Sequence, residues 1–224
     1  MPERVIVVAV HPDDETLGCG GTLLKHKAAG DEVYWAIVTE ITEGLGFSKR
    51  YIAQRNREIK KVASLFGFDG MIKFGVPAMH VDSYDHADLV TALGGIFGEL
   101  APTVVYLPFK NDIHSDHRKV FEAAYSCTKS FRHPSILRTL MMETLSESEY
   151  APTIPAESFV PNVFVDISPF LEKKLEIMSV YADEIGEHPF PRSLTGMRAL
   201  ATLRGASAGC AYAEGFMLLK EIRK

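Results

Sequence analysis

The first apolar run of the chain, RVIVVAV at residues 4–10, is continuous and rich in β-branched side chains. A run of this kind, bounded by turn residues, predicts a strand buried on both faces, as in the centre of a parallel sheet. Shorter apolar runs predict further strands at residues 32–39, 71–74, 103–107, 138–143 and 162–167. These strands would form the central layer of the fold.

Segments with apolar side chains at helical spacing alternate with these runs. They predict helices at residues 20–29, 51–66, 87–100, 117–131, 169–181, 193–203 and 212–223. The three prolines within residues 146–161 indicate a long surface loop that could border a site. Because strand and helix alternate and crossovers are right-handed, we expect a three-layer α/β fold in one domain over residues 1–224, with ligands beyond the carboxyl ends of the strands.

Composition narrows the class of protein. The net charge is −5 and the Lys and Arg residues are scattered, so nucleic acid is not an expected partner. No run of about 18 apolar residues is present, so no membrane span is predicted. Met-Pro-Glu-Arg leads directly into a predicted strand and does not resemble a signal peptide. Three widely separated cysteines lack disulfide or zinc-thiolate spacing. We expect a soluble cytoplasmic protein, and its apolar loops are compatible with a homo-oligomer.

The first chemical motif follows the first predicted strand directly and reads His11-Pro12-Asp13-Asp14-Glu15. Three carboxylates on one short loop repel each other unless a cation or hydrogen-bond donors compensate. The alternative is an acidic, solvated turn, but the position at the carboxyl end of a strand favours a metal site.

The second motif, Asn111-Asp112-Ile113-His114-Ser115-Asp116-His117, follows the predicted strand 103–107 and leads into a helix. If the helix begins near Ser115, His114 and His117 fall in its first turn and can point at one small volume. One imidazole could then bind metal while the other handles protons, although a helix start capped by Asp116 is a purely structural alternative.

Together the motifs offer imidazoles and carboxylates around an open coordination position, the ligand types of a catalytic zinc site. Zinc lowers the pKa of a bound water to about 7 and polarises a carbonyl. A nearby carboxylate can then complete the deprotonation of the water, which attacks the carbonyl carbon of an amide. Metal-assisted amide hydrolysis is therefore the expected chemistry. Spacing alone does not separate Asp13 from Asp14 as ligand or base.

The pair A-x-H-P-D-D-E, at residues 9–15, and H-x-D-H, at residues 114–117, resembles the LmbE-like or PIG-L deacetylase family. The resemblance extends along the chain through these further motifs: Gly18, Gly20 and Gly21; Arg55-x-x-Glu58; Pro161-Asn162-x-Phe164-x-Asp166; and Arg204 with Ala213-Glu214-x-Phe216. Two departures are a longer loop at residues 39–44 and Ser115 in place of a common proline.

This resemblance implies a Rossmann-like fold with a mostly parallel sheet, one zinc ion per chain, and removal of the N-acetyl group from an N-acetylated small-molecule sugar, such as an N-acetylglucosamine conjugate, nucleotide sugar or glycan precursor. It implies that the metal ligands are His11, Asp14 and His117. It further implies that Asp13 is the general base, that His114 assists as acid or oxyanion stabiliser with Asp116 orienting it, and that Arg55 grips the sugar. Other divalent metals could also fit such ligands.

Alternative functions stay open at this point. A two-metal phosphoesterase could use the same count of carboxylates and imidazoles. A sugar-binding protein without turnover would be expected to lack a base or a ligand. Among single residues, we interpret Glu15 as a supporting carboxylate, Cys19 as buried filler and His188 as a possible substrate contact. The glycines after the first motif have the wrong spacing for a dinucleotide fingerprint and fit close helix packing.

Overall fold

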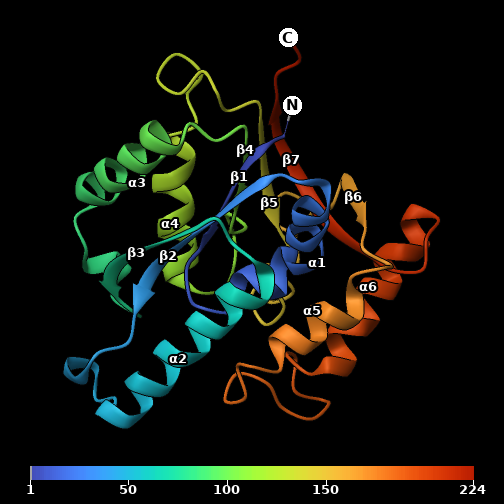
Figure 1. The fold of residues 1–224 in the computed structure, drawn as a ribbon, viewed down its shortest axis with the longest axis horizontal. Helices are drawn as coiled ribbons and strands as arrows, with labels where there is room; N and C mark the ends of the chain where they lie inside the picture. The colour runs from blue at the N-terminus through green and yellow to red at the C-terminus, as the bar shows by residue number, and fades with distance from the viewer. Residues whose placement is uncertain (1) are drawn as a thin grey trace.

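In the computed structural model, which describes residues 2–224, seven strands form one sheet with the order β3-β2-β1-β4-β5-β7-β6 (Figure 1). The strands are β1 (Arg4–Ala9), β2 (Glu32–Glu40), β3 (Gly70–Pro77), β4 (Val104–Leu107), β5 (Arg138–Met142), β6 (Val163–Asp166) and β7 (Ala213–Glu221). Neighbours from β3 to β5 pair in parallel, whereas β7 pairs antiparallel with both β5 and β6. The predicted α/β fold with a mostly parallel sheet is confirmed.

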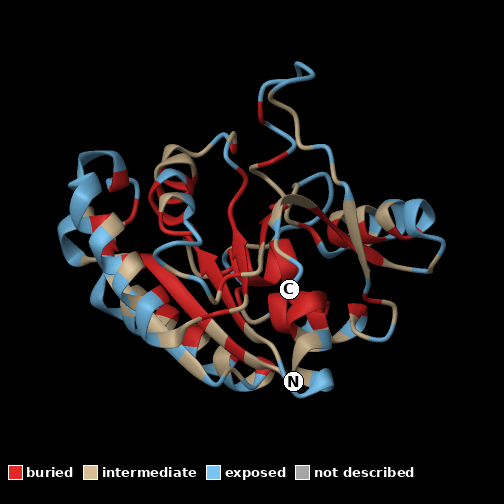
Figure 2. Cartoon of the chain, turned by 90° about the horizontal axis from the view of Figure 1, so that it is seen from above, coloured by how far each residue is buried: buried red, intermediate tan, exposed pale blue. Residues whose placement is uncertain are grey.

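Helices cover both faces of this sheet. They are α1 (Asp14–Ala29), α2 (Lys49–Phe66), α3 (His86–Leu100), α4 (Ser115–Ser126), α5 (Leu171–Met178) and α6 (Leu194–Ala208), with short 3-10 helices η1 (Glu43–Leu45) and η2 (Val81–Ser83). Side chains of α1, α2, α5 and α6 pack into one core, and those of α3 and α4 pack into a second core on the opposite face. Figure 2 shows buried positions along the sheet and on the inner sides of the helices. The three predicted layers are therefore present.

Strand β1 explains why both cores form. Its side chains alternate between the two cores: Val5 and Val7 face the first, and Ile6 and Val8 face the second. All four are fully buried. A strand with apolar partners on both faces needs no polar positions, which is why its sequence is a continuous apolar run.

The predicted C-terminal helix at residues 212–223 is wrong, because this segment is strand β7. Four consecutive apolar residues run from Phe216 to Leu219 within it. Phe216 and Leu218 pack in one core, while Met217 and Leu219 pack against the other. The alternation is masked in the sequence because both faces are apolar, and a short apolar run does not separate a strand from a helix.

Helix boundaries differ from the predictions mainly around the two motifs. Helix α1 begins at Asp14, not at residue 20, and contains a non-helical residue at Cys19. Helix α4 begins at Ser115 and ends at Ser126. Residues 146–161 carry neither helix nor strand, as predicted for a loop. Among the helices of residues 2–224, none has the length and apolarity to cross a membrane.

Candidate active site

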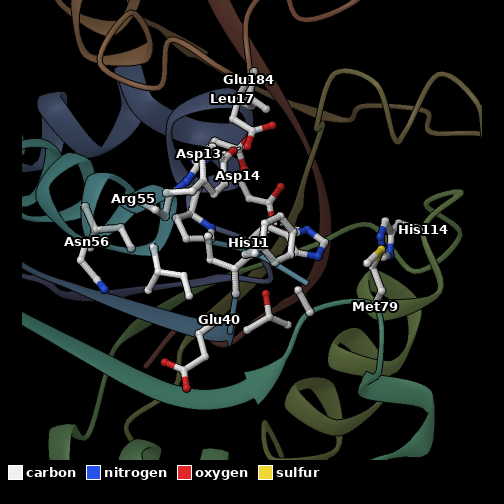
Figure 3. A pocket seen from close by; sticks show the side chains of 18 of the residues that line it. His11, Asp13, Asp14, Leu17, Glu40, Arg55, Asn56, Met79, His114 and Glu184 are labelled. Atoms are coloured by element: carbon white, nitrogen blue, oxygen red, sulfur yellow. Dashed lines mark hydrogen bonds and ion pairs between the residues drawn. The ribbon is translucent and has the colours of Figure 1, made fainter. Parts of the chain in front are cut away.

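Both motifs meet at the carboxyl ends of two neighbouring strands. The loop that starts at His11 follows β1, and the segment from Asp112 to His117 follows β4, which pairs with β1 in the sheet. The chain reverses its direction of travel across the sheet between these strands, and such a switch point leaves a crevice where α/β folds bind ligands. A cavity of about 490 Å³ opens there (Figure 3).

Three of the predicted residues bring ligand atoms together beside this cavity, whose wall includes His11 and Asp14 but not the buried His117. The Nε2 atom of His117 lies 3.3 Å from Nδ1 of His11 and 3.4 Å from Oδ2 of Asp14. The distance between Nδ1 of His11 and Oδ2 of Asp14 is 3.9 Å. His117 and Asp14 are buried, and His11 is partly buried. We call these three residues the ligand triad.

The triad has the chemistry and spacing of a divalent metal site. Two imidazole nitrogens and one carboxylate oxygen are ligand types that zinc accepts, and bonds of about 2.1 Å in tetrahedral directions place ligand atoms about 3.4 Å apart. The three separations in the triad, 3.3, 3.4 and 3.9 Å, are close to this distance between ligand atoms. The residues present therefore fit one divalent ion.

Carboxylates support the far nitrogens of both histidines. The Nδ1 atom of His117 is 2.8 Å from Oδ2 of Asp112, which is fully buried. The Nε2 atom of His11 is 3.4 Å from Oδ2 of Asp116. Metal-binding histidines commonly use such a partner to fix ring orientation and tautomer. Asp112 belongs to the second motif, but no role was predicted for it from the sequence.

The electrostatics of the site favour a positive charge. Burial lowers the pKa of His117, but Asp14 and the hydrogen bond to Asp112 outweigh it and raise that pKa to about 9. Burial raises the pKa of Asp13 well above its usual range, and the charge of Asp14 raises it further. Burial and the neighbouring negative charge disfavour the anionic form of Asp13, and a bound cation would offset both effects.

Asp13 sits outside the triad in an uncommon backbone conformation. Its φ of 142° lies in the region that side chains other than glycine rarely adopt. Its N–H donates to Oε2 of Glu15 at 3.1 Å, and Glu15 also accepts from the hydroxyl of Tyr181 at 3.1 Å. Glu15, whose burial raises its pKa to about 7, thus supports the loop from behind. The carboxylate of Asp13 lines the cavity, 3.8 Å from Nη1 of Arg192.

His114 lies across His11 from Arg55 (Figure 3), with its ring centroid 4.7 Å from that of His11. Its Nδ1 accepts the backbone N–H of Asp116 at 3.1 Å, so the neutral tautomer carries its proton on Nε2. Burial lowers the pKa of His114, which favours this neutral form.

Asp116 contacts His114 through its backbone. The backbone N–H of Asp116, not the carboxylate, contacts His114. The carboxylate accepts the N–H groups of Met79 at 2.7 Å and Val81 at 3.2 Å, and lies against His11. A backbone donor holds His114 because the ring sits at the cap position of α4, a geometry that residue spacing does not reveal.

Arg55 lines the cavity but is also paired within the protein. Its guanidinium contacts Glu184 in a short ion pair, the hydroxyl of Tyr51 at 3.3 Å and the carbonyl of Pro12 at 3.5 Å. Glu184 contacts Arg192 as well, at 3.3 Å. Glu184 was not predicted from the sequence, because it lies 129 residues from Arg55 in a segment without a motif.

Other residues singled out in the sequence lie away from the reaction centre. His188 is exposed and is not part of the cavity wall, whereas Arg192 of the same segment is. Cys19 is buried in the core. A Cβ atom at Gly21 would lie 2.7 Å from Ile167, so the glycines of α1 allow close packing.

Glu147 lies at the site, although it was not predicted from the sequence. It lines the cavity and accepts the N–H of His114 at 3.2 Å.

Comparison with known proteins places the chain in a family. A family model described as GlcNAc-PI de-N-acetylase (PIG-L) matches residues 6–128, more than half of the chain. Diacetylchitobiose deacetylase from Thermococcus kodakarensis is 24% identical over 229 residues, which cover 98% of this chain and 84% of the relative.

Solved structures share the fold over nearly the full length. The conserved protein TT1542 from Thermus thermophilus has a TM-score of 0.79 at 25% identity, covering 99% of this chain and 97% of that one. The 4-carboxy-2-hydroxymuconate hydratase from Pseudomonas putida has a TM-score of 0.77 at 15% identity, covering 99% and 98%. The second likeness concerns the fold alone. From the family match, the chain belongs to the PIG-L (LmbE-like) family.

Proposed function

We propose that this protein is a zinc-dependent hydrolase that removes the acetyl group from the nitrogen of an N-acetylated sugar, releasing acetate and a free amine. The observation that carries the proposal is the arrangement at one cavity of the ligand triad, the carboxylate of Asp13 outside it, and the imidazole of His114. A relative that bears the name of a sugar deacetylase supports the substrate class.

His11, Asp14 and His117 would hold the ion through the three atoms that lie 3.3–3.9 Å apart. When bound, a divalent ion supplies a Lewis acid that polarises the acetyl carbonyl and lowers the pKa of water. Asp112 contacts His117 and Asp116 contacts His11, and these carboxylates would hold the two imidazoles in the orientation that an ion needs.

Asp13 and His114 would divide the proton transfers between them. Asp13 accepts a proton from the water while the oxygen of the water attacks the acetyl carbon. His114 donates a hydrogen bond from Nε2 to the carbonyl oxygen as negative charge develops on that oxygen. When the C–N bond breaks, the protonated Asp13 gives its proton to the leaving nitrogen. Water has then been added across the amide, and acetate and amine are the products.

The finer assignments are parts of the same proposal. Arg55 would contact the sugar with donors that its protein partners leave free. The substrate would be a small N-acetylated sugar and not a nucleic acid, in keeping with the acidic composition. One domain, a cytoplasmic location, a homo-oligomeric state and zinc as the physiological metal stay predictions.

The test combines metal content with acetate release from methyl N-acetylglucosaminide, with and without a chelator. One zinc per chain and chelator-sensitive acetate release are expected. Two ions per chain together with phosphate-ester hydrolysis would favour the two-metal phosphoesterase instead, and turnover that survives complete metal removal would contradict the proposal.

Variants separate the roles within the site. Asp13→Asn is expected to retain zinc and lose about 100-fold or more in kcat, because it removes the general base but not a ligand. Asp14→Asn and His117→Ala are expected to lose the metal, whereas His114→Ala keeps it and slows turnover. Equal zinc content in all four variants would contradict the division between ligands and base.

A further inference from the structure

The peptide group between Pro12 and Asp13 is held at both of its polar atoms. Its N–H, which belongs to Asp13, donates to Oε2 of Glu15 at 3.1 Å. Its carbonyl oxygen, which belongs to Pro12, lies 3.5 Å from Nη1 of Arg55. Because φ measures rotation about the N–Cα bond relative to this peptide plane, the two contacts together set the φ of Asp13.

The backbone of Asp13 needs such support. A residue with a side chain keeps a φ of 142° only where its surroundings hold it there. On its other side, the carbonyl of Asp13 accepts the N–H groups of Thr16 and Leu17, both at 2.9 Å, in the first turn of α1. The backbone is therefore fixed from both directions, in a conformation that leaves the carboxylate of Asp13 at the cavity (Figure 3).

Tyr181 contacts both of the side chains that hold this peptide group. Its hydroxyl donates to Oε1 of Glu15 at 3.1 Å, whereas Oε2 of the same carboxylate accepts from Asp13. Its ring faces the guanidinium of Arg55, with 5.4 Å between Cζ and the ring centroid, which is within the range of a cation–π contact. Tyr181 is fully buried, so its side chain has little freedom to leave either partner.

The turn that follows α5 fixes Arg55 twice. Tyr181 lies in this turn, and its carbonyl accepts the N–H of Glu184 at 2.9 Å. The carboxylate of Glu184 forms the short ion pair with Arg55. One turn thus supplies both the ring contact and the ion pair that hold the guanidinium next to Pro12.

The hydroxyl of Tyr181 joins Glu15 to a segment outside its own helix. Oε1 of Glu15 also accepts the hydroxyl of Thr16 at 2.6 Å, but Thr16 is the next residue of α1 and moves with Glu15. Tyr181 lies 166 residues away in the chain. Phenylalanine would fill the same core position without a hydroxyl, which is costly to bury unless it is hydrogen-bonded. Core packing alone therefore does not explain a tyrosine at this position.

We propose that Tyr181 is a positioning residue for the general base: through Glu15 and Arg55 it holds the Pro12–Asp13 peptide group in the orientation that keeps the carboxylate of Asp13 at the cavity. This inference rests on the proposed function, in which Asp13 accepts the proton of the attacking water. Tyr181 does not line the cavity, so it acts on the reaction only through its partners. Weaker support should lower kcat, because small displacements of a catalytic group slow the chemical step.

The experiment compares two buried tyrosines that undergo the same change. Tyr181→Phe removes the hydroxyl but keeps the ring against Arg55. Tyr106→Phe removes a hydroxyl that lies 3.0 Å from Nε2 of His26, and Tyr106 does not line the cavity. For methyl N-acetylglucosaminide, kcat is expected to fall about tenfold in Tyr181→Phe, with KM and the Kd for zinc changed less than about threefold. Tyr106→Phe should leave all three constants unchanged, although each variant loses a buried hydrogen bond and should unfold at a lower urea concentration.

The kinetic constants separate positioning from a general structural role. An equal fall of kcat in Tyr181→Phe and Tyr106→Phe would overturn the proposal, because loss of a buried hydroxyl would then be enough to slow turnover. A higher KM or a loss of zinc in Tyr181→Phe, with kcat unchanged, would also overturn it. The role of Tyr181 would in that case lie in substrate binding or in the metal site.

Crystal structures of zinc-loaded wild type and Tyr181→Phe test the positioning without turnover. In the variant, the φ of Asp13 is expected to leave the region near 142°, or its carboxylate to move away from the cavity wall. An unchanged Asp13 in the variant would overturn the proposal even if the wild type releases acetate. A displaced Asp13 in a protein whose wild type releases no acetate would support the link from Tyr181 to Asp13 and contradict the deacetylase.

Discussion

At the residue scale, the histidines of the ligand triad are set by partners on their far nitrogens. Asp112 uses both of its oxygens in this role: Oδ2 lies 2.8 Å from Nδ1 of His117, and Oδ1 accepts the hydroxyl of Ser148 at 2.6 Å. The carboxylate is fully buried, so no water competes for these bonds. His117 is therefore held in one ring orientation before any ion arrives, which lowers the entropy cost of binding.

Asp112→Asn tests this support. The substitution keeps the shape but removes the charge that makes Nε2 of His117 a better ligand, so the Kd for zinc is expected to rise about 10-fold to 100-fold. A competition titration against a chromophoric chelator measures it. Asp69→Asn is the control, because Asp69 pairs with Lys27 at the opposite ends of the strands. A wild-type Kd in Asp112→Asn would show that the contact does not tune the ion.

At the element scale, helix α1 connects the first motif to the core through its glycines. A Cβ atom built at Gly21 would lie 2.7 Å from Cβ and Cγ2 of Ile167. Ile167 is fully buried and β-branched, so it has little freedom to move away. The close approach keeps α1 against the segment that follows β6 and thereby supports the loop that carries Asp13.

Gly21→Ala should therefore destabilise the protein by about 1–3 kcal/mol, because overpacking outweighs the gain in helix propensity. Gly95→Ala in α3 is the matched control, since a Cβ there meets nothing within 4 Å. That variant should gain up to about 1 kcal/mol from the same change. Urea unfolding of both measures the difference, and equal effects on the free energy of unfolding would contradict the packing argument.

The kink of α1 at Cys19 creates a second link, to strand β7. Cys19 leaves the helical conformation, and the N–H groups of Gly21 and Thr22 donate instead to the carboxylate of Glu214, at 2.9 and 2.7 Å. Lys174 from α5 donates to the same carboxylate at 2.7 Å. One buried anion thus joins two helices to the sheet.

Glu214→Gln is expected to cost about 3–5 kcal/mol, because it leaves the buried ammonium of Lys174 without its counter-charge. The double variant Glu214→Gln with Lys174→Met should recover part of this loss, since no charge is then buried. Urea denaturation of the two single variants and the double variant gives the coupling between the residues. Additive effects would mean that the ion pair contributes nothing beyond its separate parts.

At the scale of the whole molecule, local patterns predicted what depends on neighbours in sequence. The alternation of apolar runs predicted the layers, and strand ends predicted where His11 and His117 meet. The contact between Arg55 and Glu184 was not predictable, because Glu184 lies 129 residues away in a segment without a motif. Asp112 could have been predicted from the sequence, since it lies five residues before His117 in the same motif.

The ligand triad joins segments about half the chain apart, because His11 and Asp14 follow β1 whereas His117 belongs to α4 after β4. An ion at the triad would bind the folded chain and not the unfolded one, in which these side chains are separated. Zinc at about 1,000 times its Kd should then stabilise the fold by about 4 kcal/mol.

For a chain of this length, that stabilisation corresponds to a rise in Tm of about 10 °C, and a chelator should reverse it. Thermal unfolding with zinc and with chelator measures the shift. His117→Ala should lose most of the shift, because it removes one ligand, whereas His86→Ala, at an exposed position outside the triad, should keep it. A shift in Tm of the same size in both variants would mean that zinc binds elsewhere on the molecule and not at the ligand triad.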